Sequence, residues 1–371
     1  MAHPDHTVIL SFPSLAHLVT SPSSARATHL DAVHSAAQQT TSSLLVIVRT
    51  PPDAPSPWIP SLSSSSSTST PPTSPPPTLL APTALFLPLE QSLARIYNAA
   101  TTAFFSHPDG QGPLKQVDVV VEQMRDGVAR LCVDRDTTVS NWHYSGDSDQ
   151  GGEGNGQGKG KATAPGPSPP STTPTSDDTK LPPTYPVVAL GGTFDHLHAG
   201  HKILLTMAAS LCTSRLVVGV SDDHLLVNKK FKHLLQPIDE RMRAVRRFVE
   251  LVRPSVECDA VPLQDVYGPT ANDPTIEALV VSDETRAGGD SINTLRAERS
   301  LSQLAIFTIS LVGGEEAHRH GAEVEVEVAT KMGSTGIREW LDRRERARDG
   351  AQKEEAAQRG GDGAAGGEAV P

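Results

Sequence analysis

The order of apolar and polar residues predicts that the first part of the chain is an α/β unit. Residues 7–12, 43–49 and 117–121 are short runs rich in β-branched and other apolar side chains, which is typical of buried strands. Residues 30–39 and 87–105 fit helices. Strands that alternate with helices in this way indicate a sheet covered by helices.

The same alternation returns after residue 185 and is more regular there. Apolar runs predict strands at residues 187–190, 216–220, 256–260, 278–281 and 305–311. Helices are predicted at residues 199–213, after Pro237, at 292–303 and from Ser334 through Trp340. This order favours a mostly parallel sheet with helices on both faces, and in such sheets ligands bind outside the carboxyl ends of the strands.

Three segments show no such pattern. Residues 51–82 are almost entirely Pro, Ser and Thr, residues 147–182 are rich in Gly, Ser, Pro, Asp and Lys, and residues 346–371 are charged and rich in Gly and Ala. These compositions bury too little apolar surface to offset the entropy of ordering. They predict a disordered insertion, linker and tail, and they divide the chain into domains at residues 1–146 and 183–345.

Composition narrows the class of protein. The formal net charge of −11 argues against a protein that coats nucleic acid or a membrane surface. No apolar run approaches the roughly 18 residues of a membrane span, and the first residues lack the pattern of a signal peptide. Cys132, Cys212 and Cys258 lie far apart in apolar surroundings and are expected to be reduced. We therefore expect a soluble protein of the cytoplasm, with the nucleus as a second location.

Candidate chemistry concentrates in residues 186–205, where a strand, a Gly-rich turn and a helix follow one another. Gly191 and Gly192 allow backbone N–H groups to come close to a ligand, and the helix N-terminus that follows attracts phosphate. His198 and His201 are three residues apart, so both can face one spot at the start of that helix. Gly200 between them leaves room for a bulky anion. An ordinary turn with two surface histidines is the alternative, but the convergence of these residues favours a phosphate site.

The run from Gly191 to Lys202, GGTFDHLHAGHK, resembles the signature of the HxGH nucleotidyltransferase superfamily. Within that superfamily it is most similar to the eukaryotic-type phosphopantetheine adenylyltransferases, and the resemblance covers roughly residues 185–344. The fold it implies is α/β: a Rossmann-like nucleotidyltransferase domain with a parallel sheet, preceded here by a separate, smaller α/β domain and a disordered linker.

Three further stretches match the family. Lys229 and Lys230 follow the second strand of the domain, and the family's phosphate-binding lysine matches Lys230, with Lys229 as the alternative. Arg241 matches a recurrent family arginine, although an ion pair with Asp239 or Glu240 also explains it.

The second stretch, SDET at residues 282–285, can cap the next helix and present hydroxyls to a ligand. Bacterial members carry Arg-Gly-x-Arg there, and Arg296 is the candidate that replaces it. The third, KMGSTGIR at residues 331–338, resembles the family's ISSTxIR motif at the start of the last helix, with Gly333 in place of serine.

The resemblance implies adenylyl transfer from ATP to 4′-phosphopantetheine, with Mg²⁺ accompanying ATP, no dedicated metal site, and other enzymes of coenzyme A synthesis as possible partners. It implies that His201 contacts the α-phosphate, His198 supports the triphosphate and Lys230 neutralises the two anions. The full set of implied catalytic and binding residues is Gly191, Gly192, Thr193, Phe194, His198, Gly200, His201, Lys229, Lys230, Arg241, Ser282, Asp283, Glu284, Thr285, Asn293, Arg296, Ser334, Thr335 and Arg338. The alternatives are a nucleotidyltransferase for nicotinamide mononucleotide or a choline-type phosphate, and a non-catalytic scaffold paralogue.

The first half carries no recognisable catalytic constellation. The glycine-rich stretch around residue 155 lacks a Gly-Lys followed by Ser or Thr, so it is not a Walker loop, and the chain is expected to have one activity. Since the linker shows no apolar pattern that would dock the halves, residues 1–146 are expected to be dispensable for the chemistry. A fragment of about residues 181–345 is then expected to fold and react.

Overall fold

A computed structural model describes residues 4–13, 15–20, 23–51, 82–125, 137–141, 184–310 and 333–362. Residues 52–81 of the insertion expected at 51–82, and the whole linker expected at 147–182, lie outside the described residues. So do residues 363–371 of the expected tail and Cys132.

The first half forms a four-stranded parallel sheet, which contains the three predicted strands and one further strand, β4, that the sequence did not indicate. Its strands are β1 (His6–Ser11), β2 (Ser43–Arg49), β3 (Gln116–Val121) and β4 (Thr137–Asn141), in the order β3-β2-β1-β4. The helices of this half are α1 (Leu15–Thr20), α2 (Ser23–Gln39) and α3 (Pro82–Phe105). Both long helices begin earlier than the sequence indicated.

The second half forms a five-stranded, all-parallel sheet, which confirms the predicted α/β class. Its strands are β5 (Tyr185–Gly192), β6 (Cys212–Ser221), β7 (Glu257–Leu263), β8 (Ala278–Ser282) and β9 (Ala305–Ile309), in the order β7-β6-β5-β8-β9. Helices α4 (Ala199–Leu211), α5 (Ile238–Val252) and α6 (Arg286–Glu298) connect them. Strand order reverses at β5, so the crevice between the carboxyl ends of β5 and β8 is the expected ligand site.

Helix α6 begins six residues earlier than predicted, at Arg286 instead of residue 292. Gly288 and Gly289 hid this start, because glycine is a poor helix former. The structure gives Gly289 a packing role: a Cβ atom there would lie 3.3 Å from the Cδ1 atom of Ile306 in β9. The glycine therefore lets α6 approach the sheet closely.

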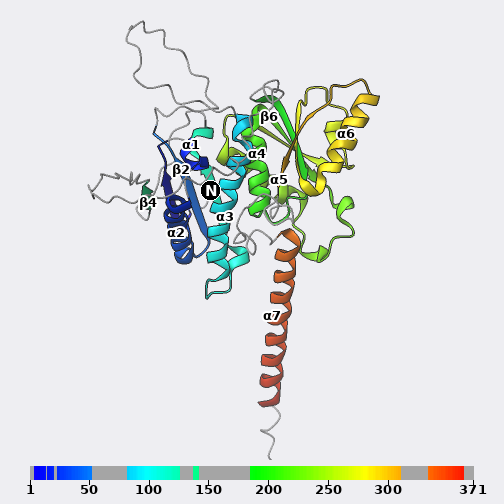
Figure 1. Cartoon of the computed structure of the whole chain (residues 1–371). Coiled ribbons are helices and arrows are strands. Elements are labelled where there is room, and N and C mark those ends of the chain that lie inside the picture. The colour runs from blue at the N-terminus through cyan, green and yellow to red at the C-terminus, as the bar shows by residue number, and fades with distance from the viewer. Residues whose placement is uncertain are drawn as a thin grey trace, which may run out of the picture.

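Helix α7 spans Ser334–Asp362, so the expectation of a disordered tail is wrong for residues 346–362. This part has no apolar period because it extends away from the body of the protein, as Figure 1 shows. Its Ala, Arg, Glu and Gln residues favour helix, and ion pairs such as Asp342 with Arg346 lie one turn apart. None of the helices in the described ranges is long and apolar enough to cross a membrane.

The two halves share one hydrophobic core, which contradicts the expectation that they do not dock. A single cluster of buried side chains runs from Val8 in β1 through Leu93 in α3 to Val280 in β8. Helix α3 packs on α2 of its own half and on α4 of the other, and Figure 1 shows α3 and α4 lying between the two sheets. The first half is therefore packed directly against the helix that follows the Gly-rich turn.

Candidate active site

The glycine-rich turn and the first turn of α4 bring the two motif histidines together. Strand β5 ends at Gly192, and α4 begins at Ala199 with His198 as its N-cap residue. The rings of His198 and His201 are stacked, with centroids 3.9 Å apart and planes 28° apart. The ring of Phe194 lies 5.1 Å from that of His201 and is fully buried. This places both imidazoles at the carboxyl end of β5, beside unpaired N–H groups of a helix start.

The loop between β5 and α4 holds two residues in the left-handed region, Phe194 (φ 50°) and His196 (φ 45°). Such conformations are uncommon for residues other than glycine and persist when neighbours fix them. Here the backbone N–H of His196 donates to the Gln236 side-chain oxygen at 2.6 Å, and the carbonyl of Thr193 accepts from Arg241 at 2.9 Å. The conformation of the loop is therefore fixed by Gln236, which precedes α5, and by Arg241 in the first turn of α5.

Burial keeps both histidines neutral near pH 7. It lowers the pKa of His198 to about 4, helped by the charge of Lys202 and by His196. It also lowers the pKa of His201 well below its ordinary value, with His198 adding to the effect. A neutral imidazole offers one N–H donor and one acceptor nitrogen. Among the described residues, the buried Nδ1 atoms of both rings have no hydrogen-bond partner, and a buried polar atom of this kind is typical of a site that meets a ligand.

A buried ion pair fastens the start of α7 to this loop. Asp195 is fully buried and Arg338 is 1% exposed, and the Nη1 atom of Arg338 donates to the Oδ2 atom of Asp195. The backbone N–H of Gln236 donates to the Oδ1 atom of Asp195 at 2.9 Å. The Ser334 hydroxyl donates to the Asp195 carbonyl at 2.8 Å. Residues 333–335, at the start of α7, thus lie directly beside the loop between β5 and α4.

The structure revises the expected role of Arg338 as a phosphate ligand. Besides Asp195, its guanidinium donates to the carbonyl of Lys230 at 3.1 Å and to the Thr335 hydroxyl at 3.2 Å. All three of its nitrogens are therefore engaged with the protein, and the side chain is buried. Arg338 therefore connects three segments: the loop between β5 and α4 through Asp195, the loop after β6 through Lys230, and the start of α7 through Thr335. Its role is to position other residues.

Arg241 is likewise fully buried, and its side chain connects neighbouring segments of the protein. Its guanidinium donates to the carbonyls of Gln236, Thr193 and Ser221 at 2.8–2.9 Å. It also pairs with Asp223 at 2.8 Å, and not with the helix neighbours considered from the sequence. Since Ser221 ends β6, this arginine joins the carboxyl ends of β5 and β6.

Arg296 and Asn293 lie at the opposite edge of the sheet, so the structure does not bring them together with the other candidates. Arg296 is fully buried and donates to the carbonyls of Thr270, Asp273, Ile276 and Ser302. Asn293 exchanges hydrogen bonds with the backbone of Leu304 at 2.8 and 3.0 Å. All these partners precede β8 or β9, whereas the histidines follow the carboxyl end of β5. A sequence shows the charge of an arginine but not which end of a helix reaches the ligand.

The remaining candidates do gather at the carboxyl edge of the second sheet. Lys229 and Lys230 are exposed in the loop after β6. Ser282 ends β8 and forms a capping box with Thr285, with their hydroxyl oxygens 3.0 Å apart, as the capping pattern predicted. The candidates that share this edge are Gly191, Gly192, Thr193, Phe194, His198, Gly200, His201, Lys229, Lys230, Ser282, Asp283, Glu284, Thr285, Ser334 and Thr335.

The first half also reaches this edge, which the sequence did not reveal. Glu90 of α3 is 2% exposed and accepts from the backbone N–H of Ser310, the residue after β9. Burial, with a smaller contribution from the nearby charge of Asp283, raises the pKa of its carboxyl to about 8 against the opposing effect of that hydrogen bond. In the sequence, Glu90 is recognisable as a charged residue within the largely apolar helix α3.

We expect Asp195→Asn to lower the free energy of unfolding by about 3–5 kcal/mol, because it leaves the buried guanidinium of Arg338 without its counter-charge. The matched control is Glu339→Gln, which breaks the exposed pair with Arg343 on the same helix and should cost about 1 kcal/mol or less. Chemical denaturation of both variants measures the difference. Equal losses would contradict the role given to Asp195.

Comparison with known proteins agrees with this geometry. Residues 189–339 match the family model described as cytidylyltransferase-like, which defines this part of the chain as a nucleotidyltransferase domain of the Rossmann-like class. The chain is 45% identical over 125 residues to the phosphopantetheine adenylyltransferase of Methanopyrus kandleri, a match that covers 34% of this chain and 78% of that protein. It is 37% identical over 131 residues to the enzyme of the same name from Pyrobaculum aerophilum, covering 35% of this chain and 83% of that protein.

The chain therefore belongs to the phosphopantetheine adenylyltransferase family. It is also 44% identical over 155 residues to the phosphopantetheine adenylyltransferase of Saccharomyces cerevisiae, which corresponds to 42% of this chain and 48% of the yeast protein. The match thus spans about half the length of this fungal relative.

Proposed function

We propose that the chain transfers the adenylyl group of ATP to 4′-phosphopantetheine, giving dephospho-coenzyme A and pyrophosphate. The observation that carries this proposal is the stacked, half-buried pair His198 and His201 at the start of α4, which follows the carboxyl end of β5, the strand at which strand order reverses. Family membership supports the choice of acceptor.

The reaction needs alignment and charge stabilisation more than acid–base chemistry. A phosphate oxygen of the acceptor attacks the α-phosphorus of ATP, the bond to the β-phosphate oxygen breaks, and pyrophosphate leaves with the electron pair. Since the nucleophile is already an anion, no general base is required. The neutral imidazole of His201 donates a hydrogen bond to the α-phosphate as charge develops, and His198 donates to the triphosphate.

Other residues of the same edge align the two anions. The exposed ammonium group of Lys230 neutralises charge where the two phosphates approach, with Lys229 beside it. Thr193 orients the attacking phosphate from the start of the loop that follows β5. Ser334 and Thr335 offer the backbone N–H groups of the first turn of α7 to the triphosphate.

Mg²⁺ is proposed to arrive with the nucleotide. The parts of the chain that the structure describes contain no group of three or more His, Cys, Asp or Glu side chains that could hold a metal ion. Mg²⁺ often binds through substrate phosphates and waters, with few protein ligands. The ion would then shield the β- and γ-phosphates while the chain's own residues hold the α-phosphate.

The proposal is tested by pyrophosphate release from ATP by the full chain, with 4′-phosphopantetheine, nicotinamide mononucleotide and phosphocholine as separate acceptors. We expect turnover with 4′-phosphopantetheine and at least a hundredfold lower kcat/KM with the other two. A preference for either of those acceptors would identify a different nucleotidyltransferase. ATP binding without turnover on any acceptor would identify a binding subunit.

We expect Gly333→Ser to lower the KM for ATP. The atom nearest to a Cβ built at Gly333 is the Nε2 atom of His198, at 4.0 Å, so a serine fits without displacement. Its hydroxyl adds one hydrogen bond to a charged phosphate, which corresponds to about 1.5–3 kcal/mol at best, or roughly tenfold to a hundredfold in KM. Gly333→Ala is the matched control, because it adds the Cβ atom without the hydroxyl. An equal KM for both variants would show that the hydroxyl makes no such contact.

A further inference from the structure

Lys202, one turn after His198 in α4, is a buried lysine whose partners come from the other half of the chain. The residue is 4% exposed. Its ammonium group lies 2.7 Å from the Oδ1 atom of Asp118, 2.7 Å from the carbonyl of Val117 and 3.1 Å from the Oε1 atom of Gln116. All three partners belong to β3 of the first sheet. A buried charge satisfied in this way is costly to leave without partners.

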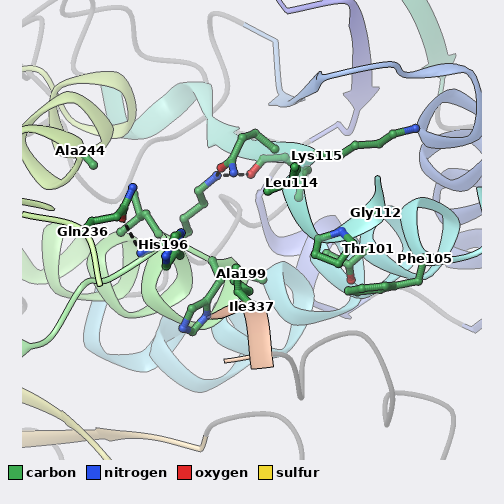
Figure 2. Close-up of a pocket in the computed structure, with 16 residues that line it drawn as sticks. Thr101, Phe105, Gly112, Leu114, Lys115, His196, Ala199, Gln236, Ala244 and Ile337 are labelled. Carbon is green, nitrogen blue, oxygen red and sulfur yellow. Dashed lines mark hydrogen bonds between the residues drawn. The ribbon is translucent and has the colours of Figure 1, made fainter. Parts of the chain in front are cut away.

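The contact lies beside the candidate active site. A cavity of about 270 Å³ at the junction of the halves is lined by Gln116 and Val117 from β3 and by His198 and Lys202 from the motif. Figure 2 shows this cavity, with Leu114 and Lys115 of the first half on one side and His196 and Ala199 of the second on another. The first half therefore forms a wall next to the histidine loop.

We propose that Asp118 and Lys202 are a positioning pair through which the first half holds the first turn of α4, and with it His198 and His201, in the geometry that the transition state of adenylyl transfer requires. The inference rests on the proposed function. It adds a role for residues 1–146, which the family match at residues 189–339 does not include.

Lys202 and His198 are connected directly through the backbone of α4. The backbone N–H of Lys202 donates to the carbonyl of His198 at 3.0 Å, so the anchored residue and the N-cap histidine belong to one helical turn. A movement of about 1 Å in a positioned group can cost about a hundredfold in rate. Rotation of this turn would also disturb the stacking of His198 on His201.

The same lysine sets the charge around His198. The titratable and charged groups that face this part of the site are Asp118 of β3, Lys115 with its partner Asp109, Asp195 and His196 of the loop, His201 and Lys202 of α4, and Arg338 of α7. The positive charge of Lys202 adds to burial in lowering the pKa of His198. Removing that charge should therefore raise the pKa of His198, which loss of packing at a distant contact would not do.

The test compares Asp118→Asn and Lys202→Met in the full chain with Arg125→Met as a matched control. Arg125 donates to the carbonyl of Leu251, so it also joins the two halves, but at the end of α5. We expect each of the first two variants to lower kcat for adenylyl transfer about tenfold to a hundredfold. The KM for ATP should change less than threefold, and Arg125→Met should keep kcat within twofold.

Nuclear magnetic resonance of labelled histidine supplies a readout that needs no turnover. We expect the pKa of His198 to rise in Lys202→Met and to stay unchanged in Arg125→Met and in Lys202→Arg, which keeps the charge. The proposal is overturned if the pKa of His198 is unchanged in Lys202→Met, or if kcat is unchanged in folded Asp118→Asn. If the wild-type chain lacks adenylyl transfer, the proposed function fails. The pKa of His198 in the variants then tests by itself whether Lys202 acts on His198.

A milder variant covers the case in which a charge substitution unfolds the chain. Gln116→Leu removes one neutral partner of Lys202 and no charge, and we expect it to lower kcat about threefold to tenfold. A wild-type kcat for this variant would then overturn the proposal.

Discussion

We expect His201→Ala to lower kcat for adenylyl transfer by about a hundredfold to a thousandfold while the chain stays folded. The reason is that His201 is a preorganised donor at the first turn of α4, stacked on His198 and packed beside Phe194. Loss of one such donor to a developing oxyanion typically costs about 10²–10³ in rate. Steady-state kinetics, with circular dichroism as the check on folding, measures this result.

His224→Ala is the matched control for this variant. His224 is half exposed in the loop after β6 and contacts the carbonyl of Gln264, at the outer edge of the same half. Its replacement should leave kcat within about twofold, as for most surface substitutions. If His201→Ala keeps wild-type kcat, the assignment of His201 is wrong. If it unfolds instead, the residue is needed for packing.

We expect the second half by itself, residues 181–345, to fold poorly and to be inactive, which reverses the expectation from the sequence. Removal of the first half takes away every partner that β3 supplies to the ammonium group of Lys202. It also uncovers the face of α4 that packs on α3, and the ring of Phe307, which lies 5.4 Å from that of Phe86. A whole domain is stable by only about 5–15 kcal/mol. Thermal unfolding and turnover of fragment and full chain measure the difference.

A nicked chain separates loss of the first half from loss of the covalent connection. A protease site placed within residues 147–182 of the full chain allows cleavage after folding. We expect the two pieces to stay together in gel filtration and to keep activity, because the shared core joins them. A fragment of residues 181–345 with full stability and turnover would show that the shared core is not needed.

Every described strand except β4, the parallel sheet of the second half and the position of the histidine motif could be predicted because they depend on local patterns. Runs of β-branched residues mark β2 and β6, and the Gly-rich turn marks the carboxyl end of β5. The start of α7 was predicted from the residues around Ser334. In each case the signal and the element occupy the same residues.

The docking of the two halves could not be predicted from the linker, since it depends on surfaces far apart in the sequence. Its signal lay in α3, where the consecutive residues Ser92, Leu93 and Ala94, which point to different sides of the helix, are all buried. A helix that is apolar on several faces must be covered on several faces. The partners of Arg241 and Arg338 could not be predicted for a related reason: they are backbone carbonyls and carboxylates that only the fold brings within reach.

The most direct measurement of the proposed function follows the label of ATP labelled at the α-phosphate, with 4′-phosphopantetheine as acceptor and the full chain as enzyme. We expect the label to enter dephospho-coenzyme A, with one pyrophosphate formed for each product molecule, because the acceptor phosphate attacks the α-phosphorus. His201→Ala should slow label transfer in the same proportion as pyrophosphate release. Label that stays in ATP, or that is released as AMP without a dephospho-coenzyme A product, would contradict adenylyl transfer to this acceptor.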